Sequence, residues 1–182
     1  MAKILMMGMS LRKDSLNKKL IANAHRLVLE SGADAELLSF NDFMMPLYDG
    51  DIESKGFPET VTSLGKKISG AQAIVFATPE YNHGIPGTFK NLIDWVSRLR
   101  PVPFSEKHIL LIGASPGAFG AARSLVHSRE PLTACGAYVY PETMAFPKAG
   151  EIFDETGNFK DAALNERLGK LLTKFRKPLA GS

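Results

Sequence analysis

Three short stretches of the sequence combine anion-binding side chains with the glycines and prolines that shape loops. Each stretch follows an apolar run and precedes a pattern typical of a helix. The three are GMSLRKDSLN (residues 8–17), TPEYNHGIPGTFKN (residues 78–91) and GASPGAFGAAR (residues 113–123). Hydroxyls and an arginine at the start of a helix favour phosphate binding, whereas a stiff loop rich in backbone amides suits the edge of a flat heterocycle.

The first stretch is suited to a phosphate group. Ser10, Ser15 and the Asn17 amide can donate hydrogen bonds. Arg12 adds a fixed fork of donors, beside the positive end of the helix that follows. Neither a Walker A pattern nor GxGxxG is present, which favours a terminal monophosphate over a pyrophosphate. The alternative is that Ser15 or Asp14 only caps the helix and that Arg12 is solvated.

The second stretch reads as a stiff loop, because it contains two prolines and two glycines. Its rings, those of Tyr81 and His83, offer contacts to a ligand or to a second substrate. The alternatives are that Tyr81 packs against the protein and that His83 lies at a loop tip. No second acidic or basic group is evident that would form an acid–base pair with Glu80. We therefore interpret Glu80 as a carboxylate of a turn or an interface.

The third stretch matches the G-x-S-x-G pattern of a hydrolase nucleophile, with Ser115 in the position of the serine. That chemistry needs the backbone N–H of the residue after the serine for its oxyanion hole. The residue here is Pro116, which has no N–H. A hydrolase is therefore disfavoured, and we expect Ser115 to hydrogen-bond a ligand, with Gly117 and Gly120 shaping the wall around it.

Composition sets the class of protein. The 182 residues are 45% hydrophobic and 23% charged, which predicts one globular domain, residues 1–182. The formal net charge of +3 suits an anionic ligand, but the basic residues are scattered, so we expect no nucleic-acid partner. No apolar run is long enough to span a bilayer and no signal-peptide cleavage site is visible, so we expect a cytoplasmic protein without membrane contact. A single cysteine, Cys135, excludes an internal disulfide.

Strand and helix patterns alternate along the chain. Strands are predicted at residues 3–9, 35–40, 73–77, 108–113 and 137–140. Helices are predicted from residue 16 to a stop at Gly32, over residues 57–69, from Pro86 onward, and over residues 120–134 and 161–176. Pro131 predicts a kink or an end of the fourth helix near residues 128–130. The alternation predicts an α/β fold, a flavodoxin-like three-layer sandwich with a five-stranded parallel sheet in the order 2-1-3-4-5 and helices on both faces. The three loops then meet at the carboxyl ends of the strands.

The three stretches resemble the NADPH-dependent FMN reductase family, which includes flavodoxin-like quinone, azo-dye and chromate reductases. The string TPEYNHGIPGTFKNLIDW carries most of the resemblance, and MPLYDGDIE (residues 45–53) and FDETGNFKD (residues 153–161) extend it over nearly the whole chain. Two positions depart from the family pattern: Met9 stands where many members have glycine, and His83 where some have tyrosine.

The resemblance implies an FMN site and an electron donor, NADPH or NADH. Its phosphate ligands would be Ser10, Arg12, Ser15 and Asn17. The isoalloxazine would be framed by Pro79, Glu80, Tyr81, Asn82 and His83, and closed on the other side by Ser115 and Gly117. The implied reaction is a ping-pong, two-electron reduction of a quinone, azo compound, metal oxyanion such as chromate, or free flavin, with no catalytic side chain and no bound metal.

Two further expectations follow from the resemblance. Flavin sites in such enzymes lie beside a subunit boundary, so we expect a homodimer or a dimer of dimers. The alternative function is that of an electron-transfer flavodoxin without NAD(P)H oxidation. Flavodoxins are typically strongly acidic, and the charge of +3 argues against that alternative.

Overall fold

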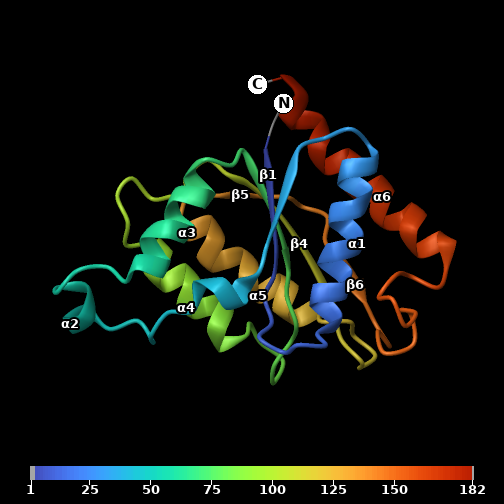
Figure 1. The fold of residues 1–182 in the computed structure, drawn as a ribbon, viewed down its shortest axis with the longest axis horizontal. Helices are drawn as coiled ribbons and strands as arrows, with labels where there is room; N and C mark the ends of the chain where they lie inside the picture. Colours follow the sequence, from blue (N-terminus) through green and yellow to red (C-terminus); the bar gives the residue numbers. More distant parts are fainter. Residues whose placement is uncertain (1–2, 182) are drawn as a thin grey trace.

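A computed structural model describes residues 3–181 as one parallel sheet between two layers of helices (Figure 1). The strands are β1 (Ile4–Gly8), β2 (Ala35–Leu38), β3 (Ala73–Ala77), β4 (His108–Ala114), β5 (Tyr138–Val139) and β6 (Met144–Phe146). Their order is β2-β1-β3-β4-β5, with β6 also paired to β4, and every pairing is parallel. The predicted fold class and strand order are therefore confirmed.

The helices divide between the two faces of the sheet (Figure 1). Their bounds are α1 (Leu16–Glu30), α2 (Gly50–Glu53), α3 (Glu59–Ser69), α4 (Gly87–Val96), α5 (Ala122–Ala134) and α6 (Ala162–Arg176), with 3-10 turns η1 (Phe40–Phe43) and η2 (Lys177–Gly181). In β1, Ile4 and Met6 join the core under α1 and α6, whereas Leu5 and Met7 join the core under α3, α4 and α5. Both faces of β1 are buried because side chains alternate across a strand.

Three sequence-based boundaries need correction. The strands predicted at residues 35–40 and 137–140 are shorter, and β6 was not predicted; it has only three residues. The break predicted at Pro131 is wrong as an end of the helix, because α5 continues through Pro131 to Ala134. Pro131 lies in the last turn, so its missing N–H removes one helical hydrogen bond with little helix left to disrupt.

Residues 44–57, which we call the arm, leave the sheet after η1 and carry α2 away from the body of the protein (Figure 1). The base of the arm is fixed to α4. Asn91 Nδ2 and Trp95 Nε1 both donate to the Pro46 carbonyl at 2.8 Å, and Asn91 Oδ1 accepts from the Tyr48 N–H at 2.8 Å. The arm is therefore attached by directed hydrogen bonds rather than by strand pairing.

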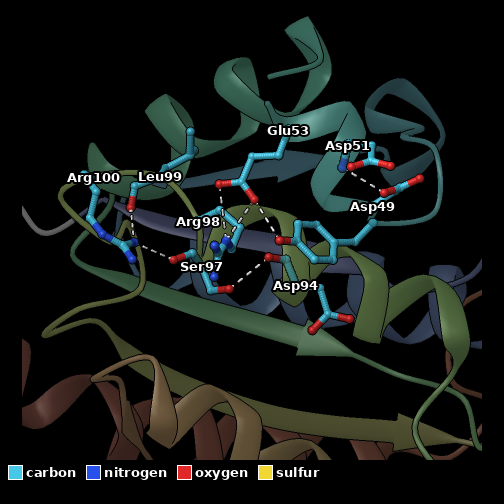
Figure 2. A network of polar contacts seen from close by, with 9 residues as sticks. Asp49, Asp51, Glu53, Asp94, Ser97, Arg98, Leu99 and Arg100 are labelled. Carbon is cyan, nitrogen blue, oxygen red and sulfur yellow. Dashed lines mark hydrogen bonds and ion pairs between the residues drawn. The ribbon is translucent and has the colours of Figure 1, made fainter. Parts of the chain in front are cut away.

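A polar network fastens the far side of the arm (Figure 2). Glu53 accepts a hydrogen bond from the Tyr48 hydroxyl at 2.7 Å and pairs with Arg98 Nε at 3.0 Å. The Arg98 guanidinium also lies 5.7 Å from the centre of the Tyr48 ring. These hydrogen bonds lower the pKa of Glu53, with the Tyr48 hydroxyl as the largest cause.

Residues 3–181 contain neither a membrane-spanning helix nor a metal-ligand cluster. No helix there combines the length and apolarity that crossing a bilayer requires. Nor does that part of the chain hold three or more His, Cys, Asp or Glu side chains grouped as a metal site.

Candidate active site

A cleft opens where the first, second and third loops meet, at the carboxyl ends of β1, β3 and β4. Loop 1 is residues 9–15, loop 2 is residues 78–86 and loop 3 is residues 115–121. The cleft is lined by Ser10, Arg12, Ser15, Leu16, Asn17, Pro79, Glu80, Tyr81, Ala114, Ser115 and Pro116. Parallel α/β sheets bind their ligands at this edge.

The first two residues of loop 1, Met9 and Ser10, are hydrogen-bonded to strand residues. The Met9 N–H donates to the Ala77 carbonyl at 2.7 Å, and the Ser10 N–H donates to the Gly8 carbonyl at 2.9 Å. Ser10 is buried at the cleft floor. A Cβ on Gly8 would lie 3.0 Å from the Asn17 carbonyl oxygen, so glycine allows α1 to begin this close to β1. The methionine that departs from the family pattern is fully buried and makes this turn without a positive φ.

Beyond Ser10, the donors of loop 1 are unused. Among the described residues, the Arg12 guanidinium has no hydrogen bond or ion pair, and the N–H groups of Leu11 and Arg12 have no acceptor. Arg12 is exposed while lining the cleft. Together with the N-terminal end of α1, these donors form a place for an anion.

Ser15, at the end of loop 1, and Asn17, in the first turn of α1, both make hydrogen bonds within the protein. The Ser15 hydroxyl caps α1 by accepting from the N–H groups of Asn17 at 3.2 Å and Lys18 at 3.4 Å. The Asn17 amide is buried and makes two hydrogen bonds to Ala114: its Nδ2 donates to the carbonyl, and its Oδ1 accepts from the N–H, both at 2.9 Å. The capping alternative thus describes Ser15, whose hydroxyl hydrogen is still free to donate.

Loop 2 ends in a tight two-residue turn. The Tyr81 N–H donates to the Gly84 carbonyl at 3.2 Å, and the Gly84 N–H donates back at 3.0 Å. Asn82 and His83 lie between them with φ of 48° and 65°, the left-handed conformation required at both central positions of a type I′ turn. Non-glycine residues adopt it at a cost, and such strain gathers at functional sites. The turn leaves the Tyr81 ring half exposed at the cleft.

Glu80 joins loop 2 to the start of α5. Its carboxylate accepts from the N–H groups of Arg123 at 2.9 Å and Ser124 at 3.3 Å, and it pairs with the Arg123 guanidinium at 3.2 Å. It therefore caps a helix whose own N-cap residue, Ala121, has no capping side chain. Burial favours a higher pKa for Glu80, but these hydrogen bonds outweigh burial and lower it.

Loop 3 is fixed from two sides. Ser115 Oγ accepts from the Gly117 N–H at 3.1 Å, and the Ser115 carbonyl accepts from the Ala149 N–H at 3.0 Å. Gly120 has a φ of 58°, and a Cβ there would lie 2.5 Å from the backbone carbonyl carbon of Phe146. Ser115 thus shapes the loop, and Pro116 beside it offers no N–H for an oxyanion hole.

The cleft brings together most, not all, of the residues singled out in the sequence. Its lining includes Ser10, Arg12, Ser15, Asn17, Pro79, Glu80, Tyr81 and Ser115. Asn82, His83 and Gly117 lie beside the cleft, exposed, on loops 2 and 3. Sequence reasoning missed Arg123, which pairs with Glu80 and stacks 4.0 Å from the centre of the exposed Phe119 ring. Its only signal was its place at the end of the third stretch.

Comparisons with known proteins agree on one family. The family model for NADPH-dependent FMN reductase matches residues 2–151. An NAD(P)H-dependent FMN reductase of Pseudomonas aeruginosa is 37% identical, over 93% of this chain and 91% of its own length. A quinone reductase of Escherichia coli is 37% identical, over 91% of this chain and 89% of its own.

A solved structure supports the same assignment. The flavoenzyme NAD(P)H:(acceptor) oxidoreductase FerB of Paracoccus denitrificans superposes with a TM-score of 0.82 and 29% identity, over 96% of this chain and 95% of its own. The family match spans β1 to β6 and therefore all three loops of the cleft. This chain belongs to the NADPH-dependent FMN reductase family.

Proposed function

We propose that this oxidoreductase holds FMN in the cleft between the three loops and uses NAD(P)H to reduce quinones there. The observation that carries the proposal is the unused donor set of loop 1, at the N-terminal end of α1 and at the carboxyl edge of a flavodoxin-like sheet. The relatives named for FMN and quinone reduction match this chain over nine-tenths of its length. Azo compounds, metal oxyanions such as chromate, and free flavin are the further acceptors to be tested.

The phosphate of FMN is assigned to loop 1. Ser10 and Ser15 supply hydroxyl hydrogens, and Arg12 supplies the charge. Asn17 Nδ2 uses one of its two hydrogens for the Ala114 carbonyl, so its second N–H is assigned to the phosphate as well. A monophosphate is favoured over a pyrophosphate because the sequence has neither a Walker A nor a GxGxxG pattern.

The flavin ring is assigned to the space between loops 2 and 3. Pro79, Glu80 and Tyr81 line it directly, while Asn82 and His83 form the turn that positions Tyr81. Ser115, with Gly117 bonded to it, bounds the other side. Bound there, the flavin would supply the two-electron chemistry, and the protein's part is to hold the ring, set its electrostatics and expose one face to substrates.

One shared face has a kinetic consequence. Transfer needs reacting atoms within about 3–3.5 Å, so nicotinamide and acceptor cannot both be bound productively over the same face. We therefore expect double-reciprocal plots at several quinone concentrations to be parallel, as in ping-pong turnover. Intersecting lines would contradict a shared site and indicate two separate ones.

The decisive experiment examines the purified protein. We expect a yellow protein that releases FMN and not FAD, that bleaches with NADPH alone under anaerobic conditions, and that regains its colour when a quinone is added. A colourless protein that FMN does not titrate would refute the cofactor. A yellow protein that NADPH and NADH both fail to bleach would instead support the flavodoxin alternative.

We also propose that the protein is a homodimer or a dimer of dimers. The arm supports this proposal, since Leu47 is 81% exposed at its base and Met44 beside it is 48% exposed. Burying such side chains against a second copy removes apolar surface from water. Light scattering that gives the 19.8 kDa monomer at micromolar concentration would contradict it.

A further inference from the structure

A second groove, of about 300 Å³, lies between the exposed face of α1 and the turn before α6. These two segments lie side by side (Figure 1). We call it the lysine groove. It is lined by Lys13, Asp14, Ser15, Lys18, Lys19, Ala22, Asn23, Arg26, Thr156, Gly157 and Asn158. Ser15 also lines the flavin cleft, so the two sites are neighbours around loop 1.

The lining of the lysine groove is strongly cationic, with four basic side chains and a single carboxylate, that of Asp14. Neither the Lys13 nor the Lys19 side-chain ammonium makes a hydrogen bond or ion pair to any residue of the described chain. Within the described chain, the Lys18 ammonium donates only to the neutral Asn41 amide oxygen, at 2.7 Å. By contrast, Lys67, Lys90 and Lys174 each pair with a carboxylate elsewhere on the surface. The positive charge of the groove is therefore largely uncompensated within the protein.

The walls of the lysine groove are held in place. The buried Asn23 amide donates to the carbonyls of Lys19 at 2.9 Å and Gly157 at 2.8 Å, which ties α1 to the turn. Asp154 Oδ1 closes the turn by accepting from the Thr156 hydroxyl at 2.7 Å and the Asn158 N–H at 2.9 Å. A site whose walls are already ordered loses less entropy when a ligand binds.

Arg26 forms the far end of the groove and is itself oriented. Its guanidinium pairs with Glu30 at 2.9 Å and donates to Asn165 at 2.9 Å. Its charge is thus partly neutralised, whereas Lys13 and Lys19 remain available. These two lysines lie at the end of the groove that adjoins loop 1.

We propose that the lysine groove binds the 2′-phosphate of NADPH and so selects NADPH over NADH. This inference rests on the proposed function, because it places the electron donor beside the flavin cleft. The two donors differ only by that phosphate dianion, and basic side chains are what accommodate a 2′-phosphate in dinucleotide sites. Lys13 and Lys19 are the selecting residues.

A binding experiment on the FMN-loaded protein tests the site without turnover. Calorimetric titration compares 2′,5′-ADP, which carries a 2′-phosphate and a 5′-phosphate, with 5′-AMP, which lacks only the 2′-phosphate. We expect 2′,5′-ADP to bind at least about fivefold more tightly, as for one phosphate met by two partly exposed lysines. Equal affinity for the two probes would overturn the assignment. So would inorganic phosphate binding as tightly as 2′,5′-ADP, since it would mean an anion site unrelated to the donor.

A double variant locates the preference. In Lys13→Ala/Lys19→Ala, the advantage of 2′,5′-ADP should vanish and the KM for NADPH should rise to about that for NADH. The matched control is Lys55→Ala/Lys66→Ala, which removes the same charge from two exposed lysines that line neither site, and it should keep the wild-type preference. A fall in affinity for both donors alike would overturn the inference. Failure of the wild type to bind FMN would instead refute the proposed function.

Discussion

The arm and loop 1 both carry charged side chains outside the sheet, but only in the arm do such side chains have partners among the described residues. In the arm, Glu53 is met by the Tyr48 hydroxyl and the Arg98 guanidinium (Figure 2). In loop 1, neither Arg12 nor Lys13 has a partner in the described chain. Charges with internal partners stabilise the fold, whereas charges without them are available to ligands. Substitutions in the arm should therefore change the free energy of unfolding, whereas substitutions in loop 1 should change FMN affinity.

The largest expected effect is on flavin binding by Arg12→Ala. This change removes a charge-assisted contact to phosphate worth about 1.5–3 kcal/mol, so FMN affinity should fall at least about tenfold. The free energy of unfolding of the FMN-free protein should stay within about 0.5 kcal/mol of wild type, because no internal contact is lost. Fluorescence titration with FMN and urea denaturation measure the two quantities. An unchanged dissociation constant would mean that Arg12 does not contact the phosphate.

The reverse pattern is expected for Asn91→Ala at the base of the arm. The nearly buried Asn91 amide makes two hydrogen bonds to the arm, so its loss should lower the free energy of unfolding by about 1–3 kcal/mol. FMN affinity should change by less than about twofold, since Asn91 does not line the cleft. Ser63→Ala is the control for urea denaturation, because the Ser63 side chain is exposed on α3 and bonds to no other described residue. Equal stability of the two variants would contradict the role given to Asn91.

Glu80 both lines the cleft and caps α5, so its substitution should change flavin binding and stability together. Glu80→Ala removes the cap of α5 and should lower the free energy of unfolding by about 0.5–2 kcal/mol. Glu80→Gln keeps one acceptor oxygen and should lose less. Since loop 2 is released from α5 in both variants, FMN affinity should fall in the same order. If stability falls while FMN affinity stays at the wild-type value, Glu80 acts only on the fold.

The smallest effect concerns acid stability. The pKa of Glu53 is lowered in the folded state, so its stabilising effect is present above the ordinary glutamate pKa of about 4.3. That effect is lost as the pH falls through the lowered value. Wild type should therefore lose stability between about pH 5 and pH 3 more steeply than Glu53→Gln. Parallel curves from urea midpoints at each pH would show that the network in Figure 2 adds nothing to stability.

Most of the fold follows from local patterns in the sequence. The buried apolar runs and the amphipathic helices specify the strand order, because parallel strands with right-handed crossovers permit few arrangements. β6 escapes this reasoning, because its three residues are too few to show a pattern and it pairs with β4 some thirty residues earlier. Pro131 misleads because its cost depends on how much helix follows it.

The candidate site was predicted in its location but not in its internal bonds. Spacing and chain order placed the three loops at one edge of the sheet. That the Asn17 amide bonds to Ala114, or that Glu80 caps α5, depends on distances between segments far apart in the chain. The left-handed turn at Asn82 and His83 was hidden because neither residue is glycine. Side chains with several hydrogen-bonding options are assigned only once the backbone around them is known.

The hydrogen bonds between Asn17 and Ala114 also bear on when the site can form during synthesis of the chain. Loop 1 and the first turn of α1 are translated early, but the backbone that fixes Asn17 in that turn comes 97 positions later. A nascent chain that has emerged only through β3 has the side chains that we assign to the phosphate, without the Ala114 backbone that holds Asn17. We therefore expect flavin to bind only after β4 has left the ribosome and joined the sheet, when most of the domain is already folded.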